Sequence, residues 1–244
     1  MPFEPTTSLE SDSPDISSLT KSQAVYETLR HWILIGRLPP GQKLDQEWLA
    51  STLKVSRMPL RQALSGLAAV GLVINRAHRG DIVSPLSAAQ LEDVYAGRRA
   101  LETMLAEAGA KLATSEDRAR MAQLVEQQET AVEQGNSEEY VLLDRKFHHI
   151  LYTASGYRES VLLIERLRDM SDRYIRFYVR SSDTAHKSIL DHWKILRAVE
   201  RGQPELARQY TDQHIEEGYN VLKDLVRERE LSDNFTDMNE GTSE

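Results

Sequence analysis

From about residue 87 to residue 230 the sequence is a series of amphipathic segments, in which apolar residues recur with the spacing of an α-helix. The breaks between the segments are short and fall at Thr114–Ser115, Gly135–Asn136, Ser155–Gly156, Ser181–Asp183 and Gly202–Pro204. They leave about six helices, and short connections place consecutive helices antiparallel. This part of the chain is therefore expected to fold as an all-α antiparallel helical bundle, which makes the chain mainly α.

Residues 21–86 follow a different pattern, with three short helical runs and then two β-like runs. An apolar stripe in residues 22–35 predicts the first helix, and the turn-rich connector GRLPPGQKL follows it. Asp45 is a suitable N-cap for a second helix, and Ser56 begins a third. The stretch LVINRAHRGDIVSP then reads as a hairpin around a basic turn. This order predicts a winged helix-turn-helix.

The charge of the chain divides in the same place. The formal net charge is −8, but residues 21–85 hold nine Lys and Arg against four Asp and Glu, a balance of +5. Residues 1–20 carry −4 and residues 86–244 carry −9. A basic module attached to an acidic body indicates a polyanion partner for the small module alone.

The start of the predicted third helix carries the residue types that read DNA. Arg57 and Arg61 lie one turn apart on its outward face, and a guanidinium can make paired bonds to guanine or clamp a phosphate. Ser56 can offer its hydroxyl and backbone N–H to a phosphate. The basic turn that ends at Gly80 can reach the DNA backbone or a minor groove. The alternative is a basic surface helix with a solvated hairpin.

The motif is longer than these residues. The runs G-R-L-P-P-G-x-x-L and L-A-x-x-L-x-V-S-R-x-P-L-R-x-A-L, followed by G-L-V and R-G, resemble the N-terminal domain of the GntR transcription regulators over roughly residues 20–85. The resemblance implies double-stranded DNA with a palindromic operator as the partner, bound by a homodimer. The candidate DNA-binding residues are Ser56, Arg57, Met58, Pro59, Arg61, Arg79 and Gly80.

Three positions depart from the family pattern. Glu47 stands where a basic residue is common, so a phosphate contact is in doubt there. Lys54 replaces a usual helix-ending Gly, and Met58 replaces a frequent Thr. Because a Met side chain cannot donate a hydrogen bond, the operator is expected to differ from the family's common ones.

A second candidate site lies in the bundle. Asp144 and His148 are four residues apart, so a helix places them on one face together with core residues such as Phe147. His192 and His214 lie on the inward stripes of two other predicted helices. Neutral imidazoles and a carboxylate suit zinc, nickel, manganese or iron. The alternatives are core histidines with ordinary hydrogen-bond partners, and an Asp144 that pairs with a nearby basic residue.

Residues 87–230 resemble the FCD ligand-sensing domain that follows the GntR module in the FadR subfamily. The resemblance is carried by R-x-x-L-E from Arg98, D-x-x-F-H from Asp144, D-H-x-x-I-L-x-A from Asp191, and G-x-x-x-x-A-x-x-x-x-x-x-H from Gly202. It implies a divalent metal ion, zinc being the first choice, held by Asp144, His148, His192 and His214. The other histidines, His31, His78, His149 and His186, match no ligand position.

An effector is expected beside the metal. Arg98 is placed to hold the carboxylate of a small organic acid, with Tyr95 and Glu102 as further candidates. The alternative for Arg98 is an ordinary i,i+4 ion pair with Glu102.

Three interpretations of function remain. The first is a metabolite-responsive DNA-binding transcription regulator, acting as a repressor and not an enzyme. The second is a metal-dependent enzyme acting on a small carboxylate, with the DNA-binding module appended. The third is a purely structural metal in a dimerising bundle. Because the sequence holds no Cys, no signal peptide and no membrane span, a cytoplasmic protein is expected; residues 1–20 and 231–244 are expected to be disordered.

Overall fold

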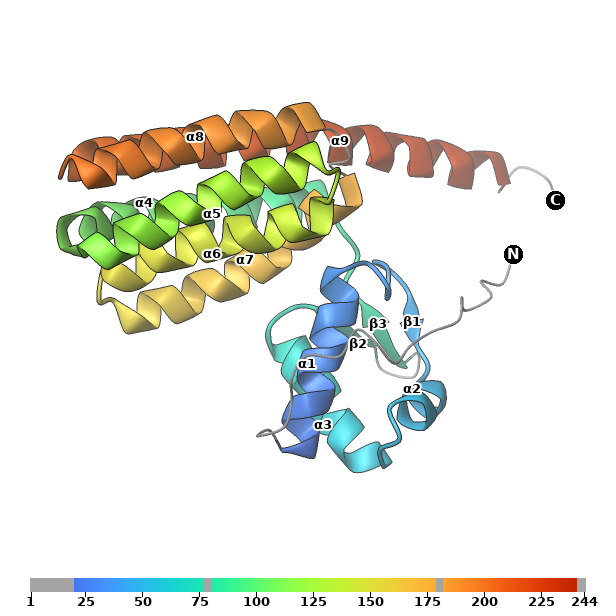
Figure 1. The fold of residues 1–244 in the computed structure, drawn as a ribbon. Helices are drawn as coiled ribbons and strands as arrows, with labels where there is room; N and C mark the ends of the chain where they lie inside the picture. Colours follow the sequence, from blue (N-terminus) through green and yellow to red (C-terminus); the bar gives the residue numbers. More distant parts are fainter. Residues whose placement is uncertain (1–19, 77–79, 179–181, 241–244) are drawn as a thin grey trace. The chain divides into compact units, whose positions relative to one another are not determined.

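The computed structural model describes residues 20–76, 80–178 and 182–240 of the chain. It divides into two compact units at Pro85 and Leu86, one residue from the boundary predicted between residues 86 and 87 (Figure 1). The acidic arm expected at residues 1–20 lies outside the described residues apart from Thr20, which caps the first helix.

The first unit is the winged helix-turn-helix that the sequence predicts. Its elements are α1 (Lys21–Leu34), β1 (Lys43–Leu44), α2 (Gln46–Thr52), α3 (Arg57–Ala69), β2 (Val73–Arg76) and β3 (Gly80–Val83). The strands form an antiparallel sheet in the order β1-β3-β2. The predicted hairpin of β2 and β3 is confirmed, whereas β1 was expected only as part of a turn-rich connector. Lys43 and Leu44 pair with Ile82 and Asp81, which provides backbone partners for the edge of β3.

Local signals set the turn between α2 and α3. The side chain of Asp45 accepts hydrogen bonds from the backbone N–H groups of Glu47 and Trp48, as expected of an N-cap. After α2, Lys54 adopts φ +53, the left-handed conformation for which Gly is the usual residue. Ser56 occupies the N-cap position of α3, but its side chain makes no capping bond.

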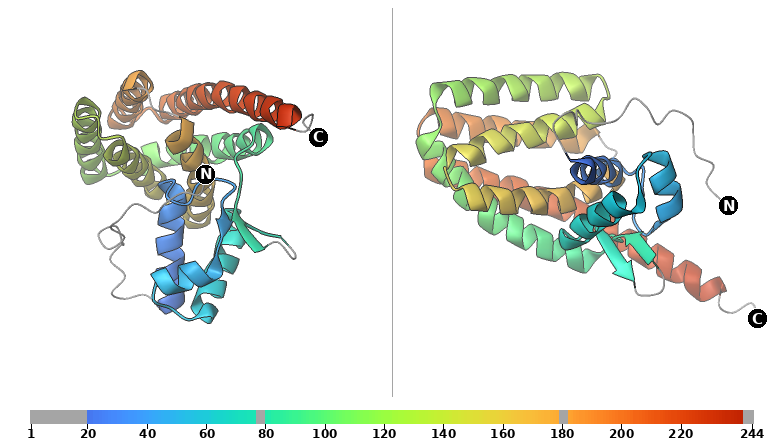
Figure 2. Two further views of the ribbon diagram at one scale, coloured as in Figure 1. Left: turned by 90° about the vertical axis from the view of Figure 1, so that its right-hand side faces the viewer. Right: turned by 90° about the horizontal axis from the view of Figure 1, so that it is seen from below.

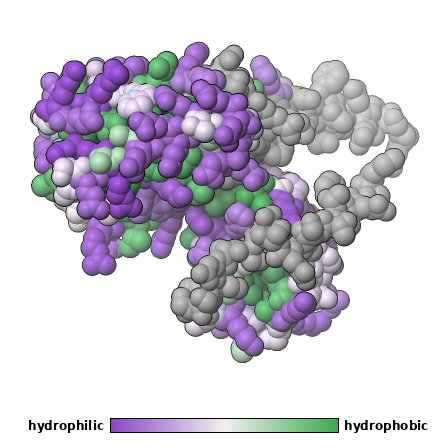
Figure 3. All heavy atoms as spheres, viewed as in Figure 1, coloured by the Kyte–Doolittle hydropathy of each residue, from purple (hydrophilic) through white to green (hydrophobic). Residues whose placement is uncertain are grey.

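The described residues of the second unit form an all-α bundle of six helices, which are separated at or near the predicted breaks. They are α4 (Ala88–Leu112), α5 (Ser115–Glu133), α6 (Ser137–Ala154), α7 (Arg158–Tyr178), α8 (Ser182–Glu200) and α9 (Pro204–Glu240). α4 packs against α6, α7 and α9, and α5 packs against α6 and α8, as the views in Figure 2 show. On the side of the bundle seen in Figure 3, hydrophilic side chains predominate and hydrophobic ones lie in small separate areas.

A glycine permits α4 and α6 to approach closely. A Cβ atom added to Gly109 would lie 2.0 Å from the backbone oxygen of Leu151 on α6. Phe147 and Leu151, which have no exposed surface, continue this contact into the core. The close approach fixes the position of α6, the helix that carries Asp144 and His148.

The predicted end of the bundle is wrong at the C-terminus. α9 continues to Glu240, so residues 231–240 are helical where a disordered tail was expected. The sequence contains no Gly or Pro between Gly218 and Gly241, so nothing in it terminates the helix earlier. Residues 241–244 lie outside the described residues. Within the described part of the chain, no helix has the length and apolar character needed to cross a membrane.

Candidate metal centre and nucleic-acid interface

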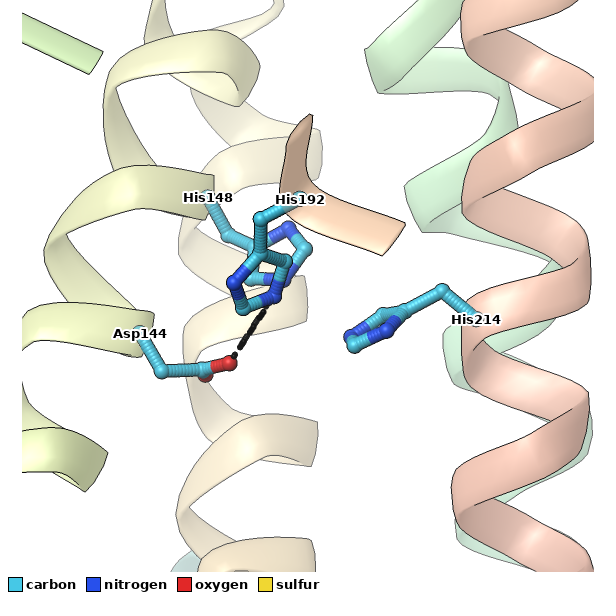
Figure 4. A group of neighbouring side chains, drawn as sticks. All are labelled: Asp144, His148, His192 and His214. Atoms are coloured by element: carbon cyan, nitrogen blue, oxygen red, sulfur yellow. Dashed lines mark hydrogen bonds and ion pairs between the residues drawn. The ribbon is translucent and has the colours of Figure 1, made fainter. Parts of the chain in front are cut away.

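The four predicted metal ligands converge on one point. Asp144 and His148 come from α6, His192 from α8 and His214 from α9. One potential ligand atom from each residue lies within 4.8 Å of the others, and Figure 4 shows the four side chains directed toward one another. The i,i+4 spacing of the first pair and the inward stripes of α8 and α9 produce this arrangement.

The distances fit a metal ion. Bonds of about 2.0–2.2 Å to a tetrahedral ion would place neighbouring ligand atoms about 3.3 Å apart. The Nε2 atom of His192 lies 3.2 Å from the Nε2 atom of His148 and 3.2 Å from Asp144 Oδ1. His148 Nε2 lies 3.8 Å from the same carboxylate oxygen. A small inward adjustment of these groups would complete the coordination geometry.

The outer nitrogen of each imidazole faces a partner outside the cluster. His148 Nδ1 lies 3.1 Å from the hydroxyl of Tyr152, and His192 Nδ1 lies 2.6 Å from Gln128 Oε1. His214 Nδ1 lies 3.8 Å from a carboxylate oxygen of Asp191. Metal-binding histidines characteristically use one nitrogen for the metal and hold the other with such a partner.

These partners also fix where the protons are. The Tyr152 hydroxyl donates to Glu102 Oε2 at 2.5 Å, so its oxygen accepts the Nδ1–H of His148. The Gln128 oxygen can only accept, so His192 also carries its proton on Nδ1. The two Nε2 lone pairs therefore face each other, and a shared cation satisfies both of them.

The ionisation states agree with this assignment. Burial, assisted by the positive charge of Arg168, lowers the pKa of both His148 and His192, so both rings are neutral near pH 7. Burial alone would raise the pKa of Asp144, but the adjacent His192 ring and the positive charge of Arg168 hold that pKa well below the ordinary value. Neutral imidazoles and an ionised carboxylate are the forms that bind a metal.

Arg168, which was not among the predicted site residues, organises the surroundings of the cluster. It donates to Asp144 Oδ2 at 2.6 Å and to Glu102 Oε2 at 3.1 Å, and its side chain is 3% exposed. Asp144 is thus held by one oxygen while the other faces the imidazoles. The available signal was an arginine on the inward stripe of α7, four residues after the buried Ile164.

The predicted effector residues lie in the same buried network. Arg98 contacts Glu102 Oε1 at 2.5 Å and donates to Ser171 Oγ at 3.0 Å, and its guanidinium lies 4.8 Å from the centre of the Tyr95 ring. The structure therefore contains the i,i+4 pair that was the alternative for Arg98. The pair is buried, however, and Glu102 connects Arg98 to Arg168 and Tyr152.

The other histidines contribute no ligand to this cluster among the described residues. His149 is exposed, and its Nδ1 atom lies 3.0 Å from Glu165 Oε1. His78 falls outside the described part of the chain.

Most of the predicted DNA-reading residues share one exposed surface. Ser56, Arg57, Met58 and Arg61 are exposed at the start of α3, and Met58 is 70% exposed. Gly80 is also exposed and has φ +82. Two candidates differ: the Pro59 side chain is buried against the core of its unit, and Arg79 lies outside the described residues.

Glu47 reduces the positive charge of this surface. Its carboxylate lies 2.7 Å from Arg57 Nη2, and both side chains are largely exposed. The family's usual basic residue at this position would repel Arg57, whereas Glu47 neutralises it in the absence of DNA.

Each of the two units matches a known protein family. Residues 21–83 match the family described as bacterial regulatory proteins, gntR family, and residues 93–217 match the FCD domain. The latter match covers just over half of the chain.

Relatives and solved structures extend the likeness over most of the sequence. The Nta operon transcriptional regulator of Aminobacter aminovorans is 30% identical over 77% of this chain and 88% of its own length. The HTH-type transcriptional repressor RspR of Escherichia coli is 27% identical, with 88% and 94% covered. The structure of Escherichia coli McbR/YncC superimposes with a TM-score of 0.77 at 23% identity, covering 84% of this chain and 98% of that protein, which shows the common fold.

Proposed function

The chain belongs to the GntR family of bacterial regulatory proteins and carries an FCD domain, and from this premise we propose that it is a sequence-specific transcription regulator that senses a small organic acid at a divalent-metal site. Residues 21–86 bind double-stranded DNA, and residues 87–230 bind the metal and the acid. The proposal is carried by the convergence of four ligand atoms within 4.8 Å, with the outer nitrogen of each histidine facing a partner.

The DNA-binding role rests on the start of α3. Arg57 and Arg61 are exposed one turn apart, as a helix that enters the major groove requires. The free hydroxyl of Ser56 is available to a phosphate, because it makes no capping bond. Gly80 permits the close approach of the wing to the DNA backbone.

Zinc is the metal that we favour for the cluster, with nickel, manganese and iron as the alternatives. Three imidazoles and one carboxylate form a donor set that zinc binds well, and the donor atoms need little movement to reach tetrahedral positions. When bound, an ion whose shell expands beyond these four ligands would supply an electrophilic anchor for a carboxylate group. Arg168 keeps Asp144 ionised and oriented, and Tyr152 and Gln128 keep the imidazole lone pairs directed inward.

The charge of the buried network supports an anionic effector. Arg98 and Arg168 balance Glu102 and Asp144, and these four groups bond directly to one another. A divalent ion adds positive charge that these four groups alone do not balance. Buried charge of this kind requires an opposite partner, which an organic acid provides. We assign Arg98, Glu102 and Tyr95 to the pocket that receives it.

Control of transcription requires that the acid change the affinity for DNA. We propose a homodimeric repressor in the cytoplasm, since a palindromic operator presents two half-sites and the relative RspR carries the word repressor in its name. A tenfold change in DNA affinity requires only about 1.4 kcal/mol of differential binding between two conformations.

Selection of genomic DNA fragments by the purified protein tests the DNA-binding role. We expect enrichment of one short palindrome, lost in Arg57→Ala and in Arg61→Ala. Arg120→Ala, which removes the same charge from an exposed position on α5, should retain the enrichment. Equal enrichment by all four proteins would overturn the assignment of the DNA contacts to Arg57 and Arg61. No enrichment by the folded metal-loaded wild type, with and without acids, would overturn the DNA-binding role.

A thermal-shift screen of small carboxylic acids tests the sensing role and separates it from the two alternatives. A sensor predicts that one acid raises the melting temperature of the metal-loaded protein alone, without being consumed, and alters its DNA affinity. A structural metal predicts no response to any acid. An enzyme predicts turnover of the acid that Asp144→Ala abolishes.

A further inference from the structure

Two adjacent apolar residues on the outer side of α7 are largely exposed. Leu162 is 59% exposed and Leu163 is 51% exposed. The other exposed large apolar side chains among the described residues of the bundle are isolated in sequence, on the termini and faces of other elements. Isolated exposed apolar residues are normal in monomers, whereas an adjacent exposed pair on one helix face indicates a contact.

Two opposite charges flank this pair symmetrically. Glu159 lies three residues before Leu162, and Arg166 lies three residues after Leu163, and both are exposed. The four positions have the i, i+3, i+4, i+7 spacing of one helix face. In the described part of the chain neither charge has an ion-pair partner. The inner side of α7, with Ile164 fully buried, is already occupied by the bundle.

We propose that this face of α7 binds a second copy of the chain, with the two α7 helices antiparallel about a two-fold axis that passes between Leu162 and Leu163. In such a pair, each residue of one copy faces the residue of the second copy that lies equally far along the helix from the axis, on its other side in sequence. Glu159 of one copy then faces Arg166 of the partner subunit, and the same contact occurs a second time. The four leucines pack together at the centre.

The order of the charges along α7 favours an antiparallel second copy of the chain as the partner. A parallel α7 pair would place Glu159 against Glu159 and Arg166 against Arg166, which is unfavourable. An antiparallel copy of the same sequence supplies both complementary charges and the central leucines. The inference rests on the proposed function in one respect, because a palindromic operator needs two copies of the DNA-binding unit.

The position of this face also connects it to the buried network. Arg168, which bonds to Asp144 and Glu102, belongs to the same helix, two residues after Arg166. The buried network and the proposed dimer contact therefore share one helix. Stable dimers bury about 800 Å² on each partner, so these four side chains form the centre of a larger contact.

Charge reversal in the full-length protein, followed by sedimentation equilibrium without DNA, tests the proposal. Glu159→Arg places Arg against Arg, and Arg166→Glu places Glu against Glu, and the symmetry repeats each repulsion. We expect each single variant to raise the dimer dissociation constant by about tenfold or more. The double variant Glu159→Arg/Arg166→Glu restores both attractions and should return to within about threefold of wild type.

Leu112→Ser serves as the control, since Leu112 is 62% exposed at the end of α4 and lies outside the proposed contact. Leu112→Ser should leave the dimer dissociation constant unchanged. Leu162→Ser should weaken the dimer without changing the melting temperature of the monomer. A monomeric wild type, single reversals without effect, or a double variant weaker than either single would overturn the proposal. DNA selection is a separate measurement from sedimentation. A negative result for the α7 interface therefore does not refute the proposed regulator function, and a negative DNA selection does not refute the interface.

Discussion

Tyr152→Phe is the substitution that most specifically tests how the metal site is prepared. The change removes only a hydroxyl, which accepts from His148 Nδ1 at 3.1 Å and donates to Glu102 at 2.5 Å. Glu102 keeps its bonds to Arg98 and Arg168, but the buried His148 loses the acceptor for its outer N–H. That imidazole is then free to move its proton to Nε2, where the metal binds.

The size of the effect follows from two independent scales. An unsatisfied buried donor costs about 1–3 kcal/mol, and loss of an outer partner of a metal-binding histidine typically lowers metal affinity by about 10–100-fold. The two ranges agree, since tenfold corresponds to about 1.4 kcal/mol. We therefore expect Tyr152→Phe to bind zinc or nickel about 10–100-fold more weakly, measured by titrating metal-free protein in competition with a chromogenic chelator.

Tyr174→Phe is the matched control. Tyr174 is also fully buried, and its hydroxyl contacts the backbone of Ser87 and the side chain of Gln90, far in sequence from the ligands. Both variants should lower the melting temperature, but Tyr174→Phe should keep the wild-type metal affinity. The reasoning is refuted if Tyr152→Phe binds metal within about threefold of wild type, or if both variants lose affinity equally.

Three further predictions concern other parts of the chain. Gly109→Ala forces a Cβ atom to within 2.0 Å of the Leu151 oxygen, so it should destabilise the protein by about 3 kcal/mol in urea unfolding; a loss below about 1 kcal/mol would contradict the close approach of α4 and α6. Burial opposes ionisation of Glu165, but its hydrogen bond to His149 and the charge of Arg145 lower its pKa to about 2 from 4.5. The stabilisation from ionised Glu165 is therefore present above pH 4.5 and is lost as the pH falls toward 2. After allowance for partial solvent exposure, Glu165→Gln should lower the free energy of unfolding by about 1 kcal/mol at pH 7. It should also flatten the dependence of stability on pH between 4.5 and 2, and parallel curves for the variant and wild type would contradict this. Glu47→Gln frees Arg57 and should tighten binding to non-specific DNA by about three- to tenfold at low salt, read by fluorescence anisotropy, while unchanged affinity would show that the pair does not restrain Arg57.

The elements of the fold were accessible from the sequence because local signals determine them. Asp45 caps α2, and the connections at Gly135 and Gly202 adopt positive φ values that favour Gly. Two other features were harder to predict. β1 pairs with a strand nearly 40 residues away, so no local sequence pattern predicts it. The polar composition after residue 230 suggested disorder, although the sequence holds no Gly or Pro between Gly218 and Gly241 that would end the helix.

The candidate ligands were found from helix faces and family resemblance, but their partners were not. A helix face tells which residues point inward, whereas it does not tell which helix they meet. Arg168 comes from α7 and Gln128 from α5, and both reach the cluster through the tertiary packing, whereas Tyr152 lies one turn after His148 on α6. The pairing of Arg98 with Glu102 was expected as an alternative, and only the packing reveals that the pair is buried.

The central claim, that Asp144, His148, His192 and His214 hold a divalent metal, is tested most directly by the metal content of the purified and dialysed protein. Two adjacent histidines provide the comparison: His148 points into the cluster with no exposed surface, and His149 is exposed beside it. We predict a stoichiometric divalent metal in wild type and in His149→Ala, and its loss in His148→Ala. Metal-free wild type after reconstitution with zinc, nickel, manganese and iron, or full metal content in His148→Ala, would contradict the account.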